Sequence, residues 1–123
     1  MGDRISISFV KAVMEEYQEE SVALFSHWDG LDFLTDVKEY LTQLKEIIGD
    51  KNKIMEPLDR LEPNTVMVDF IRWNFKSKNV IKSNYYLGRD RNDGDNSDNG
   101  HYVVNLDHLW DCDKLDDLFE NQL

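Results

Sequence analysis

The stretch that decides the fold is Ser21-Val22-Ala23-Leu24-Phe25-Ser26-His27-Trp28-Asp29-Gly30. Its first six residues have the length and the β-branched and aromatic content of a strand, and the apolar pattern of a long helix begins directly after Gly30. Because glycine adopts a positive φ at little cost, the chain is expected to turn there. We therefore predict a strand, a tight turn and a helix in this order.

The end of this strand is the part of the chain most suited to a functional site. If the alternation of the strand continues, Trp28 shares a face with Leu24 and packs at the core edge, while His27 and Asp29 share the other face. Functional residues concentrate in loops at strand ends. Two interpretations remain. The turn has a structural role, with Asp29 or Asp32 capping the helix, or His27 and Asp29 form a polar pair that does chemistry.

The helices follow from apolar residues three or four positions apart. Residues 31–48 predict one helix packed on a sheet and buried through Leu34, Val37, Leu41 and Leu44, with Leu31 and Ile47 widening the apolar stripe. Pro57 suits the start of a short helix over residues 57–61. Thr65 is expected to cap a further helix with helical spacing of Val66, Met67, Phe70, Ile71, Asn74 and Phe75. The alternation of Val66, Val68 and Phe70 would also fit a strand.

The remaining strands follow from alternation. Residues 4–10 predict a half-buried strand with Ile5, Ile7 and Phe9 inward, paired antiparallel with residues 21–26. Residues 11–20 fit either a helical turn or a strand that runs into a polar hairpin loop, with their glutamates in solvent. Residues 83–88 and 101–106 read as two strands joined by a long polar loop. On the second, Tyr102, Val104 and Leu106 form the core face, and His101, Val103, Asn105 and Asp107 form the other.

These elements predict a single α+β domain over residues 1–123. Its two layers are an antiparallel sheet of about four strands from two hairpins and helices packed on one face of that sheet. The acidic segment 111–123 is either a short helix, with Leu115, Leu118 and Phe119 on one side, or a flexible arm that meets a partner.

The charge of the chain limits its partners. The formal net charge is −11, and from Asp90 onward ten acidic residues stand against Arg91 and Lys114. Because an acidic protein repels phosphate backbones, duplex nucleic acid is not expected as a partner. The one basic cluster is either an anion site or a solvated face, and it consists of Arg72, Lys76, Lys78 and Lys82.

The expected location is the cytoplasm, without a membrane. Cys112 is the single cysteine, which excludes an intramolecular disulfide and suits a reducing compartment. Its acidic neighbours raise the pKa of a thiol and make it a poor nucleophile. There is no apolar run near 18 residues and no signal peptide pattern.

Two motifs together resemble a family of small uncharacterised proteins of prokaryotes and their phages. One is the strand ending in Leu24-Phe25-Ser26-His27-Trp28-Asp29-Gly30, which is similar to a His-Trp-Asp/Gly-Gly turn in that family. The other is the pair Asn84-Tyr85-Tyr86-Leu87-Gly88 and His101-Tyr102-Val103-Val104-Asn105-Leu106-Asp107. The two motifs cover about a quarter of the chain. The resemblance implies a fold with a closing hairpin and no particular activity.

The loop over residues 89–100 is rich in oxygen ligands. Asp95, Ser97, Asn99 and Gly100 fit positions 1, 3, 5 and 6 of a calcium loop, but the twelfth position is Leu106 and no helix flanks the loop. An EF-hand is therefore excluded, and we expect a mobile, solvated loop whose candidate cation ligands are Asp93, Asp95, Ser97 and Asn99.

The sequence supports two functions and does not decide between them. The first is a non-catalytic binding or interaction module for an unidentified protein or small ligand, with no cofactor specified. The second is a hydrolase or metal-dependent enzyme centred on His27 and Asp29, to which two histidines and a carboxylate could contribute. The candidate functional residues for either are His27, Trp28, Asp29, Gly30, His101 and Asp107.

Overall fold

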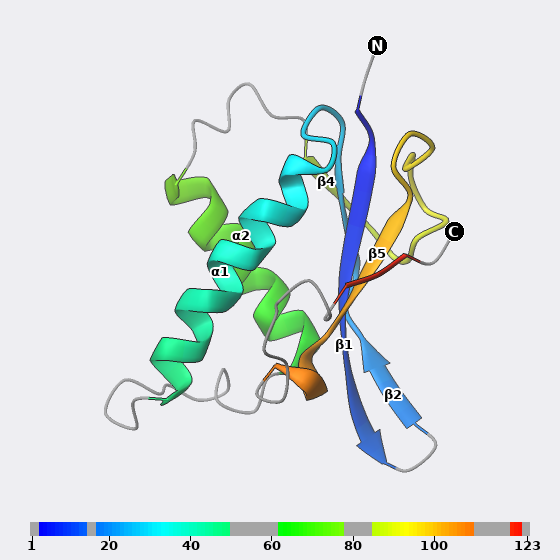
Figure 1. The fold of residues 1–123 in the computed structure, drawn as a ribbon. Helices are drawn as coiled ribbons and strands as arrows, with labels where there is room; N and C mark the ends of the chain where they lie inside the picture. The colour runs from blue at the N-terminus through cyan, green and yellow to red at the C-terminus, as the bar shows by residue number, and fades with distance from the viewer. Residues whose placement is uncertain (1–2, 15–16, 50–61, 78–84, 110–118, 122–123) are drawn as a thin grey trace.

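The computed structural model describes residues 3–14, 17–49, 62–77, 85–109 and 119–121. Within these ranges, helices α1 (Asp32–Gly49) and α2 (Pro63–Ser77) cover one face of a six-stranded sheet (Figure 1). The predicted α+β class, with helices on one face of the sheet, is confirmed. The strands are β1 (Ile5–Met14), β2 (Tyr17–Glu20), β3 (Ala23–Ser26), β4 (Tyr85–Gly88), β5 (His101–Asn105) and β6 (Phe119–Asn121).

The sheet differs from the prediction in its topology. The strand order is β4-β3-β1-β5-β6, and β2 pairs with the far half of β1. Strand β3 pairs antiparallel with both β1 and β4. Strand β5 pairs with β1 in parallel. The expected second hairpin between β4 and β5 is therefore wrong, because β3 and β1 lie between them. A long polar loop has the same sequence character whether it joins two neighbouring antiparallel strands or carries the chain across the sheet to a distant strand.

Strands β2 and β3 both pair antiparallel with β1, and the register of this pairing changes by one residue between them. The backbone N–H of Ser21 donates to the carbonyl of Phe9 at 2.8 Å, and the Ser21 hydroxyl accepts from the Phe9 N–H at 2.9 Å. The Ser21 side chain thus replaces a backbone acceptor where the register changes. Residues 11–20 form the strand and hairpin that the sequence allowed as one of two alternatives.

The helices bury the stripes expected of them. Val37, Leu41 and Leu44 of α1 are fully buried, Leu34 is partly buried, and Leu31 lies before the helix with its side chain 56% exposed. Helix α2 begins at Pro63 rather than at Thr65. Proline suits this first position because its missing N–H has no helical partner there.

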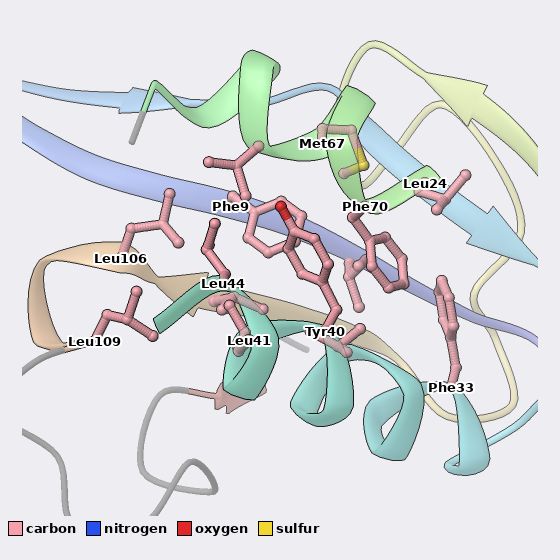
Figure 2. Packing of buried hydrophobic residues seen from close by; sticks show 14 of the residues in the cluster. Phe9, Leu24, Phe33, Tyr40, Leu41, Leu44, Met67, Phe70, Leu106 and Leu109 are labelled. Atoms are coloured by element: carbon pink, nitrogen blue, oxygen red, sulfur yellow. The ribbon is translucent and has the colours of Figure 1, made fainter. Parts of the chain in front are cut away.

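Phe70 of α2 occupies the centre of the core (Figure 2). Its ring lies edge-on to those of Phe9 at 6.2 Å and Tyr40 at 5.3 Å, and is tilted to that of Phe33 at 5.9 Å. Phe70 therefore joins the sheet to the first turn and the middle of α1. Polar contacts outside the core add to this packing.

The two helices are also joined by hydrogen bonds. The Tyr40 hydroxyl donates to Asp69 at 2.8 Å, and the guanidinium of Arg72 donates to the same carboxylate at 2.7 Å. Burial, with the charge of Asp69, raises the pKa of Tyr40, so this hydroxyl remains a donor. Trp73 donates to Gln43 at 3.0 Å.

The loop of residues 89–100 packs on the sheet face opposite the helices (Figure 1). The rings of Phe25 and Tyr86 stack there at 5.0 Å, and a Cβ on Gly94 would lie 2.8 Å from both. The N–H of Asp95 donates to the Tyr86 hydroxyl at 2.8 Å. These contacts hold the loop on the sheet, because glycine lets the backbone rest directly on the rings. Most residues of the loop are exposed, as predicted for a solvated loop, and its mobility stays a prediction.

Several predicted features lie outside the described residues. These are the short helix 57–61, Cys112, and the acidic residues of segment 110–118. Phe119, expected on a terminal helix, instead belongs to β6, which pairs antiparallel with β5. In the ranges that the structure describes, neither helix is long and apolar enough to cross a membrane.

The buried stripe of α1 can be tested by comparing two leucines. Leu41→Ala is expected to lower the free energy of unfolding by about 2 to 5 kcal/mol, because Leu41 is fully buried. Leu31→Ala is the control, and it should change that free energy by less than about 0.5 kcal/mol because Leu31 is exposed. Urea unfolding of both variants measures this. Equal losses would contradict the packing described.

Candidate functional site

The turn after β3 is held by its neighbours. Gly30 has a φ of +56°, as expected, and its N–H donates to the carbonyl of Asp3 at 2.9 Å. The Asp3 N–H donates in turn to the carbonyl of His27 at 2.9 Å. The carboxylate of Asp29 accepts a hydrogen bond from the Tyr85 hydroxyl at the start of β4. The turn is therefore bonded to the segment just before β1 and to the first residue of β4.

Trp28 does not pack at the core edge. Its side chain is 48% exposed, and the ring of His27 lies edge-on to it at 4.3 Å. The prediction is wrong because β3 ends at Ser26, so the alternation of side chains does not reach Trp28. His27 is partly exposed. Hydrogen bonds with Ser97 are the main cause that lowers the pKa of Asp95, and Arg4 and then His27 add smaller contributions.

His101 lies in a buried hydrogen-bond chain on the sheet face opposite the helices. Its Nδ1 is 2.6 Å from the Ser6 hydroxyl and its Nε2 is 2.9 Å from the Ser8 hydroxyl. The Asn96 amide donates to Ser6 at 2.9 Å, and Ser8 donates to the carboxylate of Glu20 at 2.6 Å. We call these five residues the His101 network.

The two ends of the His101 network determine the tautomer of the imidazole. Because Ser8 donates its proton to Glu20, its oxygen accepts from Nε2–H. A neutral imidazole with its proton on Nε2 has an unprotonated Nδ1, so the Ser6 hydroxyl donates to Nδ1 while its oxygen accepts from the Asn96 amide. All the donors therefore point from Asn96 toward Glu20.

The imidazole in this network is neutral. Burial is the main cause that lowers the pKa of His101 to about 4, and the charge of Arg91 lowers it further. The carboxylates of Glu20 and Asp90 oppose this shift without cancelling it. Although serine, histidine and glutamate occur together, both serines are fully buried and Ser8 donates to Glu20 rather than to the imidazole. The arrangement satisfies buried polar atoms and presents no nucleophile to a substrate.

The predicted site residues do not converge. Residues 27–30 lie beside the start of β1, whereas the carboxylate of Asp107 accepts from the Ala12 N–H at 2.7 Å near its other end. From Ile5 to Ala12 a strand spans about 23 Å. His101 lies between them, with both of its nitrogens already engaged.

The candidate cation ligands of the loop are used by the loop itself. Asp93 accepts from the Arg89 N–H at 2.8 Å, and Asp95 accepts from the Ser97 N–H at 3.0 Å and pairs with Arg4 at 3.0 Å. The Asn99 amide donates to the Arg4 carbonyl at 3.2 Å. In the part of the chain that the structure describes, no three His, Cys, Asp or Glu side chains are placed to hold a metal ion.

Sequence reasoning missed four members of the His101 network, namely Ser6, Ser8, Glu20 and Asn96. The signal was present in part, because two serines alternate with large apolar residues on the central strand. Such alternation is typical of a strand with one face in solvent, and nothing in the local sequence indicates that a distant loop covers the serine face of β1. Asn74 was also missed as a special position. It is fully buried on α2, and both polar atoms of its side chain lack a hydrogen-bond partner in the described structure.

Comparison of this chain with protein families, with curated proteins and with solved structures finds no match.

The exposure of Trp28 gives a direct prediction. Trp28→Ala should lower the free energy of unfolding by less than about 1 kcal/mol, because the side chain is half exposed. Phe25→Ala, on the preceding strand β3, should cost about 3 to 5 kcal/mol because its ring is fully buried. Denaturant unfolding of both variants distinguishes these values. A cost for Trp28→Ala near that of Phe25→Ala would show that the indole is part of the core.

The His101 network predicts a pH dependence of stability. The folded pKa of His101, about 4, lies below its ordinary value of 6.5, so the unfolded chain binds the extra proton first. The contribution of the neutral His101 to the free energy of unfolding is complete above pH 6.5. Below that pH the free energy of unfolding falls by about 1.4 kcal/mol per pH unit until the pH reaches about 4. Urea unfolding across this window measures the slope. In His101→Gln the slope should be shallower, and parallel profiles would refute the assignment.

Proposed function

We propose that this chain is a non-catalytic protein-interaction module of the cytoplasm. One observation carries the proposal: large apolar side chains remain exposed on three elements that meet at Tyr85, namely the turn after β3, α2 and β4. They are Trp28 and Leu31 at the turn, Val68 and Phe75 on α2, and Tyr86 and Leu87 on β4, with Tyr86 on the sheet face opposite the helices. Large apolar residues left exposed on adjoining elements are typical of surfaces that bind another protein.

The turn and β4 adjoin each other. Tyr85, the first residue of β4, donates to Asp29 of the turn, and its ring contacts Phe33 at 5.6 Å and Phe75 at 6.3 Å. Tyr85 thus lies where the turn, α1, α2 and β4 meet. Its packing keeps the exposed residues on rigid elements, which lowers the entropy lost on binding.

The geometry supports this function better than a catalytic one centred on His27 and Asp29. Asp29 is engaged by Tyr85, His27 packs on Trp28, and Asp107 lies at the other end of β1. A reducing compartment suits the single Cys112, which supports the proposed location.

Selection from a displayed library of random peptides tests the proposal. Peptides should be enriched on the wild-type protein, because its exposed apolar surface is preformed. His27→Ala should retain them, since the imidazole performs no chemistry in this function. The matched assay is a panel of ester, phosphoester and peptide substrates on both proteins. Turnover by the wild type that is lost in His27→Ala, or a selection without enrichment, would contradict the proposal.

A further inference from the structure

We propose that the His101 network is a pH-sensitive switch that holds the middle of the polar loop on the sheet and releases it when His101 takes up a proton. We call the released part, residues 91–96, the switch segment. It contacts the network through Asn96 and rests on the ring of Phe25 through Gly94. Its release would uncover that ring, which is fully buried.

Asn96 attaches the switch segment to β1 and also fixes its shape. The side-chain amide donates one hydrogen to the Ser6 hydroxyl at 2.9 Å and the other to the carbonyl of Arg91 at 3.0 Å. The first bond joins the segment to the sheet, and the second closes the segment on itself. A change in the hydrogen bonding of Ser6 therefore acts on the segment through a single side chain.

A proton on His101 reverses the hydrogen bond between the imidazole and Ser6. In the neutral ring, Nδ1 accepts from the Ser6 hydroxyl at 2.6 Å. In the imidazolium both ring nitrogens are donors, so Nδ1–H would donate to the Ser6 oxygen, which already accepts from Asn96. The hydroxyl hydrogen of Ser6 then loses its acceptor. Because Ser6 is fully buried, the unpaired hydroxyl destabilises the closed position of the segment.

Rotation of the Asn96 amide does not remove this conflict. It would turn the amide oxygen toward Ser6 and give the hydroxyl an acceptor. The same oxygen would then face the carbonyl oxygen of Arg91, which in the neutral network accepts from the amide nitrogen. Two acceptors repel each other in this position, so one of the two contacts of Asn96 is lost in either orientation.

The opposite end of the network becomes stronger when His101 is protonated. Nε2–H still donates to Ser8 at 2.9 Å, and Nε2 lies 3.9 Å from the carboxylate of Glu20 on β2. The positive imidazolium would therefore form an ion pair with Glu20. The proton thus moves the favourable contact from the switch segment to β2.

Charges from the loop, β2 and β6 face His101. Arg91 of the switch segment repels the imidazolium, which favours release, whereas Glu20 and Asp90 attract it. Glu120 of β6 lies on the same sheet face as His101. Burial outweighs these charges and lowers the pKa of His101 to about 4 while the segment is closed. In the open position the imidazole reaches water and its pKa returns toward 6.5, so acid favours release.

The last residues of the loop are held independently of His101. The N–H of Asn99 donates to the carbonyl of Arg4 at 2.9 Å, and the side chain of Arg4 pairs with Asp98 at 3.4 Å. Arg4 also pairs with Asp95 of the switch segment at 3.0 Å, but both side chains are partly exposed, so this pair contributes little. Acid is therefore expected to release the switch segment while Asn99 stays bonded to Arg4.

Amide hydrogen exchange, measured by NMR at residue resolution, tests the switch. The reporter is the N–H of Asp95, which donates to the Tyr86 hydroxyl at 2.8 Å and reaches solvent when the segment opens. Its protection factor should fall about tenfold per pH unit between pH 6.5 and about 4, because the open imidazole binds the proton more tightly. The N–H of Asn99 is the internal reference, and its protection should not follow this slope. A protection factor of Asp95 that does not change with pH would overturn the inference.

Low concentrations of urea separate local release from global unfolding. Release exposes little surface, so the exchange of the Asp95 N–H should hardly respond to urea, whereas exchange through global unfolding should accelerate. The buried face of α1 supplies the N–H groups that report global unfolding. Equal protection of Asp95 and α1, with the same response to urea, would contradict a local switch.

Two histidines give the matched variants. His101→Gln should abolish the pH slope at Asp95, because glutamine takes up no proton. His27→Gln should keep the slope, although the charge of His27 also acts on Asp95. A slope that is lost in His27→Gln, or kept in His101→Gln, would overturn the assignment of the switch to His101.

If His101→Gln does not fold, the wild-type protein still decides. The imidazole signals of His101 and the amide shift of Asp95 should follow one titration curve, because the same proton controls both. Two curves with different midpoints would show that the segment does not respond to His101.

Discussion

The fold depends on the requirement that the polar atoms of β1 be satisfied while both of its faces are buried. Ile5, Ile7 and Phe9 point into the helix layer, and Ser6 and Ser8, which alternate with them, point to the opposite face, where they are equally inaccessible. A buried hydroxyl without a partner costs about 1 to 3 kcal/mol, so the covering elements must supply hydrogen bonds as well as contact area. His101, Asn96 and Glu20 supply them from three separate segments. The parallel pairing of β5, the docked loop and the neutral imidazole follow from this single constraint.

The sequence predicts those parts of the fold whose cause is local. The stripe of α1 and the alternation of β1 are visible because a helix or strand repeats its own period. The partner of β1 is not local, since Ser6 and His101 are 95 residues apart. The second hairpin was therefore predicted wrongly: β4 and β5 look like neighbours in sequence, while the register that joins β5 to β1 is decided by the hydroxyls it must meet. Trp28 shows a second limit, because alternation predicts a face only as far as the strand extends, and β3 ends at Ser26.

The candidate site was predicted in part for the same reasons. Residues 27–30 do lie together, because a tight turn is encoded locally, and Gly30 has the positive φ expected of it. His101 and Asp107 were added on the parity of a strand, which gives a face but no position along the sheet. The structure places them in unrelated roles, one inside a buried network and one accepting a backbone N–H from Ala12. Asn74 shows that the rule of satisfied buried polar groups has an exception here, at a buried position of α2.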